Sequence, residues 1–111
     1  MNRLDGKIAL LSGAARGIGA ETARLMVEAG ARVMIGDILD ERGRETTRAI
    51  GGSDAAAIFH HLDVTSEEDW SAAISAAVAR WGGLDILVNN AGMFLGRRRA
   101  LMNGTASALS T

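Results

Sequence analysis

The feature that most constrains the fold of this chain is a glycine-rich turn at residues 12–19, with the sequence SGAARGIG. Residues 7–11, before the turn, are mostly apolar, as in a buried parallel strand that is covered on both faces. The residues that follow with helical spacing on one face are Ile18, Thr22, Leu25, Met26 and Ala29. Gly30 predicts the end of this helix. The pattern therefore predicts a strand that enters a helix through a turn with three glycines.

The turn itself predicts a binding site for phosphate groups. Glycine lets the backbone turn sharply and come close to a ligand. The first N–H groups of a helix have no partner within the helix, and they lie at the positive end of its dipole. A pyrophosphate is therefore expected at the start of this helix. A plain tight turn without a ligand is the alternative, and the turn alone does not exclude it.

A second strand and helix follow the first pair. Residues 32–36 read as a strand that ends at Asp37, and Asp40 is placed to cap a helix over residues 41–50. A Gly-Gly pair directly after these residues predicts the end of the helix.

The third strand and helix are predicted in the same way. Residues 56–62 read as a strand followed by Asp63, and Thr65 with Glu68 has the spacing of a capping box. One apolar face then recurs at helical spacing: Trp70, Ile74, Ala77, Val78 and Trp81. A further Gly-Gly pair predicts the end of this helix.

A fourth strand is predicted at residues 84–88, and the run Asn89-Asn90-Ala91-Gly92 follows it. This alternation predicts an α/β fold, with a parallel sheet, flanking helices and right-handed crossovers. We expect the strand order 3-2-1-4 and a site at the carboxyl ends of the strands. The glycine-rich turn, Asp37, Asp63 and the Asn-Asn-Ala-Gly run all follow such ends.

The pattern divides the chain into two parts. Residues 1–94 are expected to form a half-domain of βαβαβαβ order that binds a dinucleotide, and residues 95–111 an unpatterned tail. A chain of 111 residues holds one small domain at most.

Composition narrows the possible partners. A net charge of −1 and a pI near 6.1 give no reason to expect nucleic acid or an anionic membrane. The absence of cysteine excludes a disulfide framework and a cysteine-ligated metal. His60 and His61 are adjacent and point to opposite faces of a strand, so no metal site is expected there. The apolar run near the N-terminus is too short for a signal peptide or a membrane span, and we expect a cytoplasmic protein.

The glycine spacing G-x-x-x-G-x-G differs from the common G-x-G-x-x-G fingerprint. It resembles the T-G-x-x-x-G-I-G signature of the short-chain dehydrogenase/reductase family, with Ser12 in place of the threonine. The Asp63-Val64 pair and the Asn-Asn-Ala-Gly run resemble two further motifs of that family. The resemblance extends from Leu4 to about Gly92, and it is closest to bacterial 3α(20β)-hydroxysteroid dehydrogenases. It implies an NAD(P)-binding Rossmann fold that is truncated after the fourth strand.

The resemblance also implies which residues bind the cofactor. They are Gly13, Arg16, Gly17, Ile18, Gly19, Asp37, Ile38, Asp63, Val64, Asn90, Ala91 and Gly92. Within this set, Asp63 would meet the adenine amino group, and Asn90 would lie near the cofactor ribose. The family also implies that Asn89 braces the sheet and does not bind the cofactor.

Asp37 predicts which cofactor is bound. A carboxylate at the end of the second strand can accept hydrogen bonds from the adenosine ribose, and it would repel a 2′-phosphate. Arg16 favours the opposite choice, because a basic residue at this place is found in family members that use NADP. A carboxylate that faces a phosphate is more unfavourable than one flexible arginine can offset, so we expect NAD, with NADP less favoured.

The family's catalytic residues are missing from this chain. They include a Tyr-x-x-x-Lys pair, and the chain contains no tyrosine, so no catalytic residue is assigned. One interpretation is the cofactor-binding part of an NAD-dependent oxidoreductase that acts on secondary alcohols or ketones, hydroxysteroids among them. The family then implies NAD(H), a small alcohol or ketone in the full-length parent, and a homo-oligomer. The other interpretation is a non-catalytic NAD-binding module that acts through a partner. A Tyr-x-x-x-Lys reading frame in the downstream DNA would favour the first.

Overall fold

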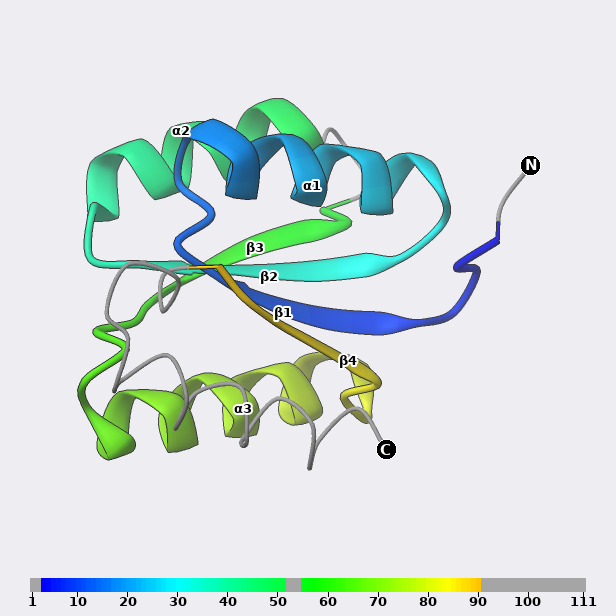
Figure 1. The fold of residues 1–111 in the computed structure, drawn as a ribbon. Coiled ribbons are helices and arrows are strands. Elements are labelled where there is room, and N and C mark those ends of the chain that lie inside the picture. Colours follow the sequence, from blue (N-terminus) through cyan, green and yellow to red (C-terminus); the bar gives the residue numbers. More distant parts are fainter. Residues whose placement is uncertain (1–2, 52–54, 91–111) are drawn as a thin grey trace.

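The computed structural model describes residues 3–51 and 55–90, in which strands and helices alternate (Figure 1). The elements are β1 (Ile8–Ser12), α1 (Gly17–Glu28), β2 (Arg32–Asp37), α2 (Asp40–Gly51), β3 (Ala57–His61), α3 (Glu67–Trp81) and β4 (Ile86–Asn89). The predicted order of elements is therefore confirmed over this part of the chain.

The strands form one parallel sheet in the order β3-β2-β1-β4. Helices α1 and α2 cover one face, and α3 covers the other (Figure 1). This three-layer arrangement is the Rossmann-like α/β fold that the sequence predicts, because right-handed crossovers from a first strand put helices on both faces.

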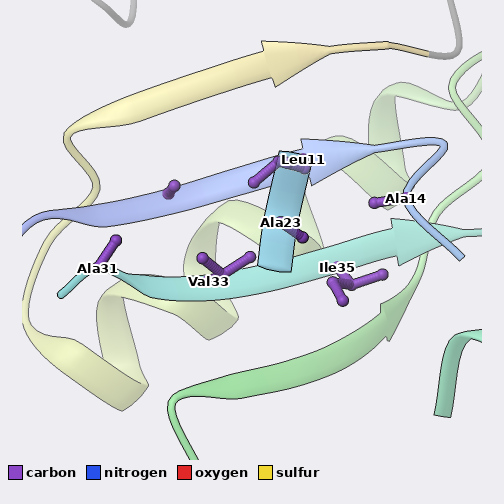
Figure 2. Close-up of a cluster of buried hydrophobic side chains, with 7 residues drawn as sticks. Leu11, Ala14, Ala23, Ala31, Val33 and Ile35 are labelled. Carbon is purple, nitrogen blue, oxygen red and sulfur yellow. The ribbon is translucent and has the colours of Figure 1, made fainter. Parts of the chain in front are cut away.

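Apolar side chains of β1 and β2 alternate between the two faces of the sheet. Leu11, Val33 and Ile35 belong to the buried cluster beneath α1 and α2, which Figure 2 shows. Leu10 and Met34 belong to the cluster on the side of α3. Successive residues of a strand point to opposite faces, so a continuous apolar run fills both cores.

Helix α1 faces the core through only part of the predicted apolar face. Ile18 and Leu25 are 76% and 52% exposed, whereas Gly19 and Ala23 are buried and Met26 is partly buried. The small residues at Gly19 and Ala23 allow α1 to lie close to the backbone beneath it. The prediction was wrong at Ile18 and Leu25, because apolarity alone does not show that small residues make the contact, and it was right at Met26.

The start of α3 also differs from the predicted capping box of Thr65 and Glu68. The N-cap is Ser66, whose side-chain oxygen accepts a hydrogen bond from the Asp69 backbone N–H at 3.1 Å. The Thr65 hydroxyl donates instead to Asp63 Oδ1 at 2.7 Å. The prediction was one residue out of register, because either hydroxyl residue suits the position and the turn before the helix decides between them.

Helix α2 begins at Asp40 itself, so Asp40 lies inside the first turn and is not the residue before it. Its carboxylate accepts a hydrogen bond from His61 at 2.6 Å, and among the described residues it accepts none from a backbone N–H of the helix, so the predicted cap is wrong.

On α3 the predicted apolar face is right except at Val78, which is 44% exposed. Ala77, directly before it, is buried beside Trp70 and Ala73. Neighbouring helical residues differ in direction by about 100°, so both cannot face the sheet.

Over residues 3–51 and 55–90, no helix is long and apolar enough to cross a membrane.

Candidate functional site

The polar features predicted from the sequence meet at one edge of the sheet. The glycine-rich turn follows β1, Asp37 ends β2, Asp63 follows β3, and Asn90 follows β4. All four strands run parallel, so these residues lie at the carboxyl edge, where α/β sheets bind their ligands.

The conformation of the turn requires its glycines. Gly13 and Gly17 have φ angles of +65° and +64°, a region that L side chains rarely adopt. A Cβ atom on Gly19 would lie 2.3 Å from the carbonyl oxygen of Gly13 and 2.9 Å from Nδ2 of Asn90. Any side chain at Gly19 would therefore push the turn away from the start of α1.

The N-terminus of α1 is suited to an anion. Arg16 is the N-cap residue, and within the described chain its side chain makes no capping hydrogen bond. The first turn of the helix also contains no acidic residue. The positive end of the helix dipole is thus not neutralised by a neighbouring carboxylate of that turn, and a phosphate group fits there.

Asp37 is fixed beside this turn by backbone N–H groups. Its Oδ2 accepts a hydrogen bond from Ala15 N–H at 3.1 Å, and its Oδ1 accepts one from Leu39 N–H at 3.1 Å. An ionised carboxylate has about four acceptor positions, so these two bonds use part of its capacity. The following residue, Ile38, is 59% exposed. The arrangement fits a carboxylate that also accepts hydrogen bonds from ribose hydroxyls.

The loop after β3 is fixed by α3. The Asp63 N–H donates to Asp69 Oδ2 at 2.9 Å, and Asp63 Oδ1 accepts from the N–H of Thr65 at 2.9 Å. Trp70 Nε1–H donates to the carbonyl oxygen of Val64 at 3.0 Å. Asp63 and Val64 are therefore held in place by contacts within the protein.

His61 lies between two carboxylates near this loop. Its Nδ1–H donates to Asp40 Oδ1 at 2.6 Å, and its Nε2 lies 3.9 Å from Asp69 Oδ2. The hydrogen bond to Asp40 raises the pKa of His61 above 6.5, and desolvation opposes this increase. The charges of Asp40, Asp69 and Asp63 also raise this pKa. The neighbouring His60 turns its Nδ1 to the carbonyl oxygen of His61 at 2.9 Å.

The described residues contain no cluster of three or more potential ligands that could hold a metal ion.

The two asparagines at the end of β4 make different contacts. Asn89 Oδ1 accepts a hydrogen bond from the Ser12 hydroxyl at 2.8 Å and so links β4 to β1. Asn90 Nδ2 donates to the carbonyl oxygen of Gly13 at 3.3 Å, which places Asn90 against the glycine-rich turn. Ala91, Gly92 and the tail at residues 95–111 lie outside the described residues.

One residue at this site was missed by the sequence analysis. The hydroxyl of Thr46, in α2, donates a hydrogen bond to the carbonyl oxygen of Ala15 in the turn. The two residues are 31 positions apart, and no local pattern indicates which residue of a helix contacts a distant turn.

Comparison with known proteins identifies the family of this arrangement. The sequence pattern of the short chain dehydrogenase family matches residues 7–109. The trans-4-hydroxycyclohexanecarboxylate dehydrogenase of Sinomonas cyclohexanicum is 49% identical over 84% of this chain and 38% of its own length. The 3-alpha-(or 20-beta)-hydroxysteroid dehydrogenase of Mycobacterium bovis is 52% identical over 82% of this chain and 34% of its own length.

A solved structure is similar as well. The hydroxysteroid dehydrogenase from Escherichia coli superimposes with a TM-score of 0.72 at 38% identity, over 77% of this chain and 36% of that one. The chain thus spans about a third of the length of the relatives that it matches.

Proposed function

Because the chain belongs to the short-chain dehydrogenase/reductase family, we propose that it is the cofactor-binding part of an NAD-dependent oxidoreductase. The observation that carries this proposal is the position of Asp37, which accepts a hydrogen bond from Ala15 in the turn before an uncapped helix. The hydrogen bond between Asp37 and Ala15 places the carboxylate proposed to bind the ribose next to the turn proposed to bind the phosphates. The residues proposed to contact the cofactor are those assigned from the family motifs.

The charge of Asp37 supports NAD over NADP. A 2′-phosphate beside its carboxylate would place two negative charges a few ångströms apart, which is unfavourable by about 1–3 kcal/mol at a protein surface. Arg16 is exposed at the N-cap of α1 and makes no capping bond in the described chain, so its attraction to a phosphate is weakened by water.

The substrate class of the whole protein is proposed from its relatives. Two of them are named for a hydroxysteroid and for a hydroxycyclohexanecarboxylate, and both names describe a hydroxyl group on a carbon ring. We therefore propose secondary alcohols and ketones, with hydroxysteroid-like molecules as the favoured class. A cytoplasmic location and a homo-oligomer are also proposed. No membrane partner and no nucleic-acid partner is proposed.

The isolated chain is proposed to be catalytically inactive, because it contains no tyrosine for the proton transfer that the family performs. The same observation supports a second candidate, a non-catalytic NAD-binding module that acts through a partner. The DNA downstream of the coding sequence separates the two candidates. A reading frame with Tyr-x-x-x-Lys supports the oxidoreductase, and its absence supports the module.

Titration calorimetry with NAD and NADP tests the cofactor preference. We predict that the wild-type chain binds NAD about fivefold to a hundredfold more tightly than NADP, and that Asp37→Ala brings this ratio close to one. Asp85→Ala is the matched control, because Asp85 also accepts a backbone N–H, from Ile8 at 2.9 Å, but at the opposite edge of the sheet. It should leave the ratio unchanged. Tighter binding of NADP than of NAD by the wild type would refute the preference.

A further inference from the structure

We propose that Thr46 of α2 is a positioning residue for the glycine-rich turn, a role that rests on the proposed binding of NAD. Its hydroxyl donates a hydrogen bond to the carbonyl oxygen of Ala15, and this contact joins α2 to the turn before α1. Figure 1 shows α2 beside α1 on the same face of the sheet, so α2 can support the turn from that side.

Both backbone polar groups of Ala15 make hydrogen bonds to side chains. Its N–H donates to Asp37 Oδ2 at 3.1 Å, and its carbonyl oxygen accepts from Thr46. Asp37 Oδ1 in turn accepts from the N–H of Leu39, directly before α2. The turn, the end of β2 and α2 are thus joined by a series of hydrogen bonds. Ala15 is fully buried, so water does not take the place of the Thr46 hydroxyl when that hydroxyl is removed.

The contact with Thr46 fixes the orientation of the Ala15–Arg16 peptide. In a trans peptide the C=O and N–H groups point in opposite directions, and the described chain has no cis peptide bond. Holding the Ala15 carbonyl against α2 therefore directs the Arg16 N–H away from α2. A flipped peptide would instead direct the carbonyl oxygen away from α2 at the N-cap of α1, where its partial negative charge would repel a phosphate.

Thr47 offers a matched control on the same helix. Its hydroxyl donates to the carbonyl oxygen of Gly43 at 2.7 Å, which is a contact within α2 and does not reach the turn. Thr46→Val and Thr47→Val each replace a hydroxyl with a methyl group of similar shape, and they change helix propensity alike. The two variants differ in whether the hydrogen bond that they remove holds the cofactor turn.

Saturation-transfer NMR titrations of the full chain with NAD and with adenosine separate a positioning role from a structural one. Adenosine lacks phosphate groups, and its proposed ribose acceptor, Asp37, is bonded to the Ala15 N–H, which belongs to the preceding peptide. Its affinity should therefore depend little on the orientation of the Ala15–Arg16 peptide. We predict that Thr46→Val weakens NAD binding by about threefold to tenfold, as expected for one hydrogen bond, and changes adenosine binding by less than about twofold. Thr47→Val should leave both affinities at the wild-type values. Thr46→Ser, which keeps the hydroxyl, should restore NAD binding.

Several outcomes would overturn the inference. Equal affinities for Thr46→Val and Thr47→Val, or equal losses for NAD and adenosine, would show that the turn is not positioned by this hydroxyl. Loss of NAD binding in Thr46→Ser would show the same. A Thr46→Val chain without the wild-type circular dichroism spectrum would make Thr46 a general stability residue. A wild-type chain that binds no NAD would refute the proposed function itself, whereas the other outcomes leave that function intact.

Discussion

Individual polar side chains at the carboxyl edge of the sheet make hydrogen bonds to backbone groups of the neighbouring loops. Asp37 accepts from Ala15, Asp63 accepts from Thr65, and Asn90 donates to Gly13. Each of these side chains was assigned to cofactor binding from sequence motifs, and each also fixes a loop. The loops are therefore held in position by the protein itself, which lowers the entropy that binding would otherwise have to offset.

The ion pair of His61 and Asp40 predicts a pH-dependent contribution to stability. The pKa of His61 is raised above 6.5 in the folded chain, mainly by its hydrogen bond to Asp40. Protonated His61 therefore stabilises the fold fully below pH 6.5, and this contribution is lost as the pH rises through the raised pKa. We predict that the difference in unfolding free energy between wild type and His61→Gln decreases as the pH rises from about 5 to about 8.

Urea unfolding at a series of pH values measures this difference. Asp40→Asn removes the hydrogen-bond partner and should reduce the pH dependence, but less than His61→Gln does, because the charges of Asp69 and Asp63 still raise the pKa of His61. Glu41→Gln removes a carboxylate from the same turn of α2 and should keep the wild-type dependence. A difference between wild type and His61→Gln that stays constant or grows with pH would show that the pair does not act in this way.

At the scale of elements, the order of strands and helices could be predicted, but their contacts and ends could not. Apolar runs and glycine pairs indicated every described element. The fourth strand was expected at residues 84–88 and is found at Ile86–Asn89. Its pairing with β1 begins at Ala9 opposite Ile86, while the Asp85 side chain binds the Ile8 N–H. The first and last residues of β4 depend on its pairing with β1, which is distant in the sequence. The apolarity of nearby residues therefore does not indicate where β4 begins and ends.

The N-cap of α3 allows a quantitative prediction at this scale. Ser66→Ala removes the side-chain acceptor for the Asp69 N–H, and we expect it to lower the unfolding free energy by about 1 kcal/mol. Ser71→Ala is the control, because Ser71 is exposed within the same helix and alanine favours helix there. Urea unfolding of both variants makes the comparison. Equal stability of Ser66→Ala and Ser71→Ala would contradict the assignment of the cap.

At the scale of the whole molecule, topology explains why the site could be predicted in part. Right-handed crossovers bring the ends of the parallel strands to one edge, so the motifs after β1, β2, β3 and β4 converge. The support for the turn from α2 could not be predicted, because the side-chain contact of Thr46 depends on how the helix is packed. The exposure of Ile18 was missed for the same reason, since it is the neighbouring Gly19 that is buried against the turn.

We propose that this chain binds NAD but does not catalyse the reaction of its family. The oxidation of an alcohol by hydride transfer needs a proton acceptor at the substrate oxygen, and a positioned acid or base typically contributes about 10² to 10⁴ in rate. The chain has no tyrosine for this role, and Asp37 and Asp63 belong to the part of the site proposed for the adenosine.

The most direct measurement combines binding and turnover in one sample of purified chain whose mass is confirmed as that of 111 residues. NAD binding is followed by saturation-transfer NMR, and NADH formation by its absorbance in the presence of secondary alcohols and hydroxysteroids. We predict binding of NAD without NADH formation above the rate of a sample that lacks protein. Sustained turnover by a chain of the correct mass, or the absence of NAD binding, would refute the proposal that the chain binds NAD without catalysis.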